Sequence, residues 1–130
     1  MRITAGGAII KSGRILLGLR AAQGSYYPGF WDIFGGHCEA GETPEETLSR
    51  ELYEELGILP EKVSFLAVYD EPQPELYGMG KHYFFAVTEW SGKPSNLGSE
   101  HDEIRWFTLS DLEKVKLASE EYREIFKPLL

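Results

Sequence analysis

Three glutamates, Glu51, Glu54 and Glu55, stand three and four residues apart. In a helix this spacing places all three carboxylates on one face. Like charges so close repel one another and weaken an isolated helix by roughly a few tenths of a kcal/mol. A chain that keeps them together is expected to hold a cation there. Carboxylate oxygens suit hard divalent ions, so we predict an Mg²⁺ site, with Mn²⁺ as an alternative.

The helix that must position these glutamates is strongly specified by its own residues. Thr43, Pro44 and Glu46 form a capping box with proline at the first helical position, and Gly57 provides a C-terminal stop. A narrow apolar stripe recurs every four residues between these ends, at Leu48, Leu52 and Leu56. We therefore expect the acidic face to lie beside a buried face and to remain accessible to solvent.

A longer pattern surrounds this helix. It reads Gly, five residues, Glu, seven residues, Arg-Glu, an apolar residue, any residue, Glu-Glu, any residue, Gly and an apolar residue. The pattern resembles the signature of the Nudix hydrolases, in particular the MutT-like members. Its nine positions are filled by Gly36, Glu42, Arg50, Glu51, Leu52, Glu54, Glu55, Gly57 and Ile58. Nine fixed positions are far more specific than a short glycine motif.

The resemblance implies an α/β fold, namely the Nudix α/β/α sandwich with a mixed β-sheet between helices, formed by residues 1–130 as a single domain. It also implies that Glu51, Glu54 and Glu55 bind divalent metals that bridge a diphosphate. In this family the Gly35 carbonyl would add a metal ligand, and Gly36 would permit close backbone approach.

Arg50 has an implied supporting role in the same site: it would orient Glu51 and pair with Glu42. A carboxylate of the cluster could also take a proton from the attacking water, so Arg50, Glu51 and Glu54 are the catalytic candidates on the helix. Phe34 departs from the family pattern, because proline often precedes the two glycines. That departure touches the backbone and not the charged ligands.

The loop around residue 100 holds a second group of candidates, because related enzymes often supply a further acid or a histidine from this region. Glu100 could bind metal or act as a base, and His101 could act as a base near neutral pH. The alternative is a solvated acidic loop. If a strand begins at Glu103, alternation turns Ile104 and Trp106 to the core and Glu103 outward. We therefore rank Glu100 first, His101 second and Glu103, as a supporting residue, third.

Substrate contacts are predicted from aromatic residues in loops, since a base can stack on an aromatic ring. Tyr26, Tyr27 and Tyr77 are the candidates. The expected reaction is Mg²⁺-dependent hydrolysis of a nucleoside diphosphate linked to another group, foremost a (deoxy)nucleoside triphosphate. A nucleotide sugar is the alternative substrate, because residues 101–106 resemble a segment of GDP-mannose hydrolases. A noncatalytic nucleotide-sensing module is the alternative from another class. Such modules often lose catalytic glutamates, whereas this chain keeps all of them.

Composition restricts the partners. The chain has 130 residues, 42% of them hydrophobic, and a net charge of −8. The acidic balance disfavours a nucleic-acid polymer, and no apolar run is long enough for a membrane span. Cys38 is the only cysteine, so no internal disulfide forms, and a cytoplasmic location is expected. The oligomeric state is left open, with a homodimer as one option.

The order of elements follows from hydrophobic alternation and from turn residues. Strands are predicted at 3–10, 15–19, 31–34, 63–69, 82–90 and 103–108, with loops at 21–30, 71–81 and 91–101. A second capping box, Ser110–Glu113, is expected to open a short helix, and residues 120–129 a C-terminal helix.

Overall fold

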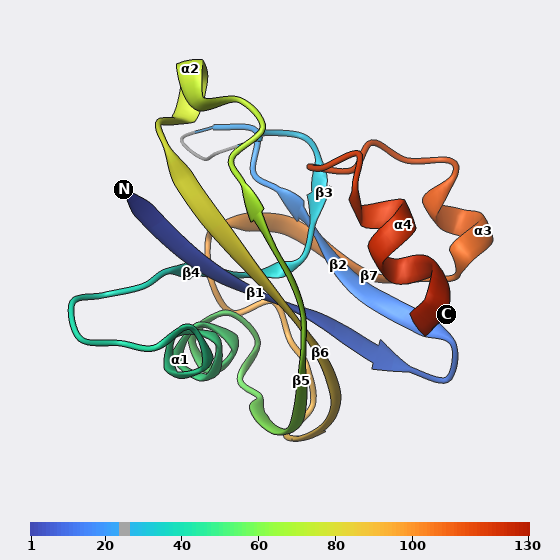
Figure 1. The fold of residues 1–130 in the computed structure, drawn as a ribbon. Helices are drawn as coiled ribbons and strands as arrows, with labels where there is room; N and C mark the ends of the chain where they lie inside the picture. Colours follow the sequence, from blue (N-terminus) through green and yellow to red (C-terminus); the bar gives the residue numbers. More distant parts are fainter. Residues whose placement is uncertain (24–26) are drawn as a thin grey trace.

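A mixed β-sheet forms the centre of the computed structural model, which describes residues 1–23 and 27–130. Its strands are β1 (Arg2–Lys11), β2 (Arg14–Arg20), β3 (Trp31–Asp32), β4 (Phe34–His37), β5 (Leu59–Asp70), β6 (Gly80–Ser91) and β7 (His101–Phe107). The main order is β3-β2-β1-β6-β5, while β4 pairs with β1 and β7 with β2 (Figure 1). Strands β1 and β6 are parallel, and β1 is antiparallel to both β2 and β4. The predicted mixed sheet is confirmed.

Helices cover the sheet on both faces. Helix α1 (Pro44–Leu56) lies on one side, and α3 (Leu109–Leu112) with α4 (Tyr122–Phe126) lies on the other (Figure 1). A 3₁₀ turn, Lys127–Leu129, follows α4, and the short α2 (Pro74–Tyr77) stands at one end of the sheet. No helix in the described ranges has the length and hydropathy needed to cross a bilayer.

Two apolar clusters sit between these layers. The first contains Leu48, Leu52 and Leu56 of α1 together with Phe34 and Phe85. The second joins the other sheet face to α3 and α4 through Leu112, Tyr122, Phe126, Trp31 and Phe107. The predicted stripe of α1 is therefore buried, and it fixes the helix against the sheet.

The ends of α1 are as predicted. The Thr43 hydroxyl accepts from the Glu46 N–H, and the Glu46 carboxylate accepts from the Thr43 N–H, so the capping box is complete. Gly57 ends the helix with φ of 72°, a left-handed conformation that favours glycine. These local contacts hold the acidic face in a defined register.

Several predicted boundaries differ from the structure. The predicted strand at 63–69 runs from Leu59 to Asp70, and the loop predicted at 71–81 contains α2. The predicted cap at Ser110 is wrong: Thr108 caps α3, with Asp111 completing the box. The same short pattern occurs at both positions, and the chain uses the one that directly follows the end of β7. The C-terminal helix is also shorter than 120–129.

Strand β7 begins at His101 and not at Glu103. Its pairing with β2 contains a bulge, because Leu19 pairs with Glu103 but Arg20 pairs with His101, leaving Asp102 as the extra residue. A bulge interrupts the alternation of side chains between the two faces. As a result His101 lies on the α1 side of the sheet, where simple alternation from Glu103 would not place it.

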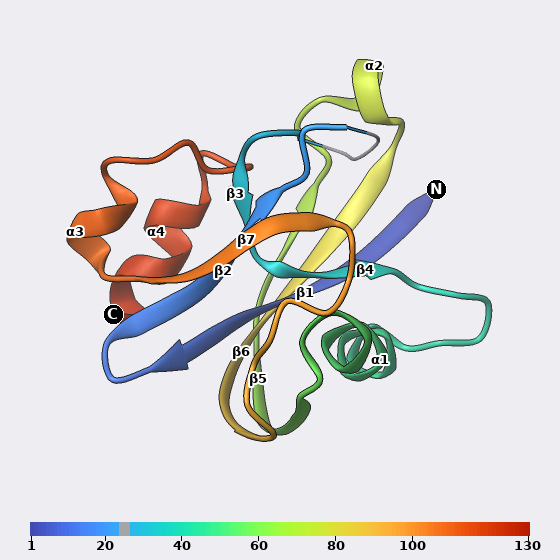
Figure 2. The same ribbon diagram turned by 180° about the vertical axis from the view of Figure 1, so that it is seen from behind.

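The segment between β6 and β7 passes beside the end of α1 (Figure 2). Two backbone hydrogen bonds hold it there, from Ser95 N–H to the Leu56 carbonyl and from Leu97 N–H to the Glu55 carbonyl. A third, from Ala21 N–H to the Glu100 carbonyl, fixes its far end at 2.9 Å. This path brings Glu100 next to the acidic face of α1.

Candidate active site

Arg50 is the organising cation of the site. Its Nε and Nη2 donate to the two oxygens of Glu42 at 2.8 and 3.0 Å, and its Nη1 donates to Glu51 Oε1 at 3.0 Å. A further bond reaches the His37 carbonyl at 3.1 Å. The hydrogen bonds from Arg50 hold the pKa of Glu42 at about 2. The structure therefore places Arg50 against both partners that the sequence suggested, and it fixes Glu51 on one side.

The three glutamates of α1 differ in exposure. The Glu54 side chain is 56% exposed, that of Glu51 12% and that of Glu55 6%. The expectation that the whole acidic face is accessible is wrong for Glu55. This residue lies three positions after Leu52 and seven after Leu48, so it borders the buried stripe of the helix.

The Glu55 carboxyl is electrostatically unfavourable as it stands. Burial, followed by the nearby charges of Glu100 and Glu51, raises its pKa to about 10. Burial also raises the pKa of Glu51, although Arg50 opposes the shift. Neither Glu55 oxygen has a well-formed hydrogen bond in the described part of the chain. Three carboxyls thus converge where their charges cannot all be solvated.

This donor set fits a divalent cation. Among residues 1–23 and 27–130, no three acid, histidine or cysteine side chains already stand in metal-holding geometry. Even so, the Glu55 oxygens are buried and unsatisfied, and the neighbouring groups are carboxylates, which are ligands that Mg²⁺ and Mn²⁺ prefer. A cation would satisfy those oxygens and would offset the repulsion among Glu51, Glu55 and Glu100.

Gly35 and Gly36 bring strand β4 close to the site for two separate reasons. A Cβ on Gly35 would meet the Ala5 carbonyl oxygen of β1 at 1.9 Å, so no side chain fits between these strands. A Cβ on Gly36 would lie 2.4 Å from the Glu51 carboxyl. The first glycine therefore permits strand pairing and the second gives Glu51 its place. A ligand role for the Gly35 carbonyl stays a prediction.

His101 does not lie on the loop as predicted. The bulge buries its side chain, which is 2% exposed, against Phe34, with ring centroids 4.9 Å apart. Its Nδ1 is 3.8 Å from Glu55 Oε1, and burial, followed by the charge of Arg20, lowers the pKa of His101 to about 4. The ring is therefore neutral near pH 7 and packs beside the Glu55 carboxyl.

The other two candidates of this region are separated by the same bulge. Glu100 is exposed on the loop, lines the same cavity as Glu51 and acts on the pKa of both Glu51 and Glu55. Glu103 instead forms an ion pair with Arg105 at 2.6 Å on the surface. The geometry brings Glu100 into the cluster and leaves Glu103 outside it.

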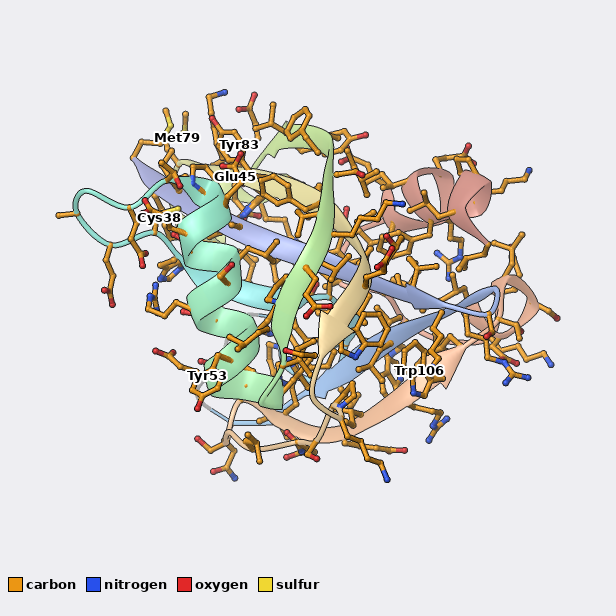
Figure 3. All side chains as sticks on the ribbon, turned by 90° about the horizontal axis from the view of Figure 1, so that it is seen from below. Cys38, Glu45, Tyr53, Met79, Tyr83 and Trp106 are labelled. Atoms are coloured by element: carbon orange, nitrogen blue, oxygen red, sulfur yellow. The ribbon has the colours of Figure 1, made fainter. Side chains whose placement is uncertain are left out.

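A cavity of about 450 Å³ extends from Glu51 and Glu100 across β1 toward Tyr27 and Tyr122. Tyr27 and Tyr77 stack on each other with ring centroids 4.6 Å apart and an angle of 28°. Two of the predicted stacking residues thus lie together, while Tyr26 lies outside the described residues. Cys38 is a partly buried free thiol in the loop that leads into α1 (Figure 3).

Sequence reasoning missed two acids that line this cavity, the partly buried Asp32 and the buried Glu71. Asp32 accepts from the Tyr122 hydroxyl and from its neighbour's backbone N–H, and it pairs with Arg20 at 3.4 Å. Glu71 accepts from several donors, including the Tyr27 hydroxyl. Asp32 carried a signal, since it is the one acid in an apolar strand. The partners of Glu71 are scattered along the chain, so no sequence signal marked this residue.

The comparisons with known proteins agree with this geometry. The sequence model of the NUDIX domain matches residues 1–129. An ADP-ribose pyrophosphatase of Methanocaldococcus jannaschii is 33% identical over 109 residues, which are 84% of this chain and 63% of that protein. An 8-oxo-dGTP diphosphatase of Proteus vulgaris is 34% identical over 96 residues, 72% of this chain and 80% of that protein. The chain thus spans less than two thirds of the length of the first of these relatives.

A solved structure shares the whole arrangement of elements. The crystal structure of a MutT NUDIX hydrolase from Burkholderia pseudomallei superimposes with a TM-score of 0.86 at 28% identity. The alignment covers 99% of this chain and 98% of that one. The likeness therefore includes the sheet, the helices on both its faces and the segment that carries the acidic cluster.

Proposed function

This chain belongs to the Nudix family, and on that premise we propose that it is a divalent-metal-dependent hydrolase that cleaves a diphosphate bond of a nucleoside triphosphate. The observation that carries the proposal is a cavity lined by Glu51, Glu100 and Tyr27, with the buried Glu55 next to the two acids. Similarity to the 8-oxo-dGTP diphosphatase of Proteus vulgaris supports a nucleoside triphosphate as substrate.

Hydrolases of this family generally need divalent metal ions. In this chain Glu51, Glu54, Glu55 and Glu100 would hold Mg²⁺ or Mn²⁺, together with the Gly35 carbonyl. When bound, such an ion lowers the pKa of a coordinated water and offsets the charge of a diphosphate. Such an offset favours binding of a polyphosphate to a chain whose net charge is −8.

The remaining chemistry is assigned to side chains of the cluster and its supports. Arg50 holds Glu51 in one orientation through its bond at 3.0 Å, and Glu42 in turn anchors Arg50. Glu100, on its exposed loop, takes the proton of the attacking water, with Glu54 as the alternative acceptor. His101 is buried and neutral, and it acts as packing beneath Glu55.

The nucleoside is proposed to lie at the tyrosine end of the cavity. A base that stacks on the Tyr27–Tyr77 pair gains about 1–3 kcal/mol, with little dependence on its identity. Stacking therefore holds many bases in the same place, while the metal cluster binds the diphosphate. A small nucleotide, rather than a nucleic-acid polymer or a membrane, is the proposed partner, and the cytoplasmic location and single-domain organisation stay predictions.

A substrate panel tests this proposal. Purified protein is incubated with the four dNTPs, 8-oxo-dGTP, ADP-ribose and GDP-mannose, each with Mg²⁺, with Mn²⁺ or with EDTA. We expect a nucleoside monophosphate and pyrophosphate from at least one triphosphate, only when a divalent ion is present. Glu54→Gln and Glu55→Gln should lower turnover by orders of magnitude with the fold retained. Glu45→Gln, in the first turn of α1 and exposed, is the matched control.

A nucleoside diphosphate linked to a sugar is the second candidate substrate, favoured by the relative from Methanocaldococcus jannaschii, which is an ADP-ribose pyrophosphatase. Cleavage of ADP-ribose or GDP-mannose, with all triphosphates untouched, would replace the first candidate by this one. Tight nucleotide binding without any hydrolysis would instead indicate a sensing module and would refute the enzyme assignment.

A further inference from the structure

Glu71 directly follows the last residue of β5, and its side chain is only 1% exposed although it carries a carboxyl group. Both oxygens have two partners. Oε2 accepts from the Tyr27 hydroxyl at 2.6 Å and from the Gln73 N–H at 3.0 Å. Oε1 accepts from Arg2 Nη2 at 3.2 Å and faces His82 Nε2 at 2.9 Å. A carboxylate has about four acceptor sites, so this one is fully used.

The carboxyl is held in its ionised form. Burial opposes ionisation, but hydrogen bonds from Tyr27, from the Gln73 N–H and from His82 outweigh it, and the pKa of Glu71 lies below its ordinary value. An ionised carboxylate can only accept, so His82 Nε2 donates to Glu71. The other ring nitrogen, His82 Nδ1, is hydrogen-bonded to the Thr4 hydroxyl at 2.6 Å. The network therefore extends from β6 to β1.

This network reaches both residues of the tyrosine stack. Tyr27 is bound directly, through its hydroxyl. Tyr77 is bound indirectly, because Arg2 also donates to the Tyr77 carbonyl, and because Gln73 begins the helix that carries Tyr77. One buried carboxylate thus fixes two aromatic residues that are 50 positions apart in the sequence.

The backbone of Tyr27 gives independent evidence that its position is enforced. Its φ is 52°, in the left-handed region, where a bulky side chain is rarely found. Such a conformation persists only when surrounding contacts determine it. Its side chain is held by the Glu71 bond, the stack on Tyr77 and an edge-to-face contact with Phe30 at 6.3 Å, and its carbonyl accepts from the Phe30 N–H at 3.3 Å. Among the side-chain contacts, only the Glu71 bond is directional and charge-assisted.

We propose that Glu71 is a positioning residue that holds Tyr27, backed by its stack on Tyr77, in place as the aromatic wall of the nucleotide cavity. The inference rests on the proposed function, because it assigns the wall to nucleotide binding. Glu71 touches no reacting atom and acts through the tyrosines. Its effect should therefore fall on nucleotide affinity and spare the chemical step.

Two variants of the full chain test this role. Glu71→Gln keeps the shape but removes acceptor capacity, and Tyr27→Phe removes only the hydroxyl that Glu71 binds. Each is measured for kcat and KM with dGTP and Mg²⁺, and for the Kd of the α,β-methylene analogue of dGTP by calorimetry. Glu75→Gln, an exposed acid in the same segment, is the matched control, and thermal unfolding reports the fold.

We expect KM and Kd to rise about tenfold in both variants, equivalent to about 1.4 kcal/mol, with kcat within about threefold of wild type. The double variant should bind the analogue no more weakly than Glu71→Gln alone, because both changes break the same hydrogen bond between Tyr27 and Glu71. Equal losses in kcat and affinity, or additive effects, would indicate a general structural role and would overturn the inference. If Glu71→Gln fails to fold, Tyr27→Phe decides alone, and unchanged affinity in it refutes the proposal.

The calorimetric measurement separates this inference from the proposed function. A wild type that binds the analogue but hydrolyses no nucleotide would refute the hydrolase while leaving the role of Glu71 open to the same comparison of Kd values. A wild type that does not bind the analogue would overturn the inference about the wall.

Discussion

Glu55 shows how an acidic side chain is tuned by its place on a helix. It lies three positions after Leu52 and seven after Leu48, at the border of the buried leucine stripe, so the packing of α1 buries it. There it meets Glu51 and Glu100, and its pKa rises to about 10. A buried carboxyl without hydrogen bonds costs stability, and it is retained here where a cation could compensate it.

The pH dependence of stability in the absence of metal tests this description. With a folded pKa of about 10 against an ordinary 4.5, native Glu55 keeps a proton that the unfolded chain releases. Stability must then fall as pH rises between those values, by at most about 1.4 kcal/mol per pH unit. His101, with its pKa lowered to about 4 from 6.5, acts in the opposite direction and only below about pH 6.5.

We therefore expect the free energy of unfolding in EDTA to fall between about pH 7 and pH 9, and Glu55→Gln to reduce that slope. Burial raises the pKa of Glu51 and Asp32 as well, so each of these groups affects stability in the same direction as Glu55 over the pH range in which it titrates. Denaturant titrations at several pH values measure both slopes. Identical slopes in wild type and variant would show that Glu55 is already ionised in the folded protein.

Glu100 and Glu103 provide a second comparison between single residues. Glu100 faces the cluster and Glu103 pairs with Arg105 on the surface. Glu100→Gln should lower kcat more than KM, as expected of a group that acts in the transition state. Glu103→Gln should change neither beyond about twofold, since exposed ion pairs contribute little. Steady-state kinetics with the best substrate of the panel decides, and a crippled Glu103→Gln would reverse the assignment.

Strand β4 and the bulge in β7 are the elements that complete the site. Strand β4 runs against β1 with glycines at the point of closest approach, which leaves Glu51 room beside it. The bulge places His101 next to Glu55 and leaves Glu100 on the loop that precedes β7. Both elements are short. Strand β4 acts through the missing side chains of its glycines, and the bulge acts through one extra residue in β7.

The two glycines of β4 should respond differently to alanine. Gly35→Ala forces a Cβ into a backbone oxygen, which cannot yield, so the melting temperature should fall by the equivalent of about 1–3 kcal/mol or more. Gly36→Ala meets the end of the Glu51 side chain, which can move, so the fold should persist while activity is lost. Gly98→Ala, with no atom closer than 4.0 Å to the new Cβ, is the control.

Thermal unfolding and turnover, measured on the same preparations, separate these outcomes. Full activity in Gly36→Ala would mean that the observed position of Glu51 is not required for catalysis.

At the scale of the whole molecule, the acidic cluster adds to a chain whose net charge is already −8. Folding therefore brings Glu51, Glu55 and Glu100 together, and the positive charges of Arg50 and Arg20 offset only a part of their repulsion. A divalent ion that binds only the folded state must stabilise it by mass action.

Mg²⁺ should accordingly raise the melting temperature in a saturable way. At an Mg²⁺ concentration about one hundred times the Kd, the free energy of unfolding rises by about 2.7 kcal/mol. KCl at equal ionic strength controls for simple screening of the negative charge, and it should produce a smaller shift that does not saturate. In Glu55→Gln the Mg²⁺ shift should shrink toward the KCl value. Equal shifts from both salts in the wild type would argue against a specific site.

The sequence by itself determined α1 and its chemistry, because the information is local. The helix is specified by a capping box, by leucines that recur every four residues and by glutamates at helical spacing. Each of these features involves residues close together in the sequence, so none depends on the rest of the chain. The family signature and the mixed sheet followed from the same segment and from alternation in the strands.

Tertiary structure decided the features that depend on contacts between distant residues. The burial of Glu55 depends on how deeply the leucine stripe sinks into the sheet. The face taken by His101 depends on a single extra residue, Asp102, in the pairing of β7 with β2, and one residue reverses every side chain before it. Glu71 gathers Arg2, Tyr27 and His82 from three parts of the chain, and no spacing in the sequence encodes that meeting.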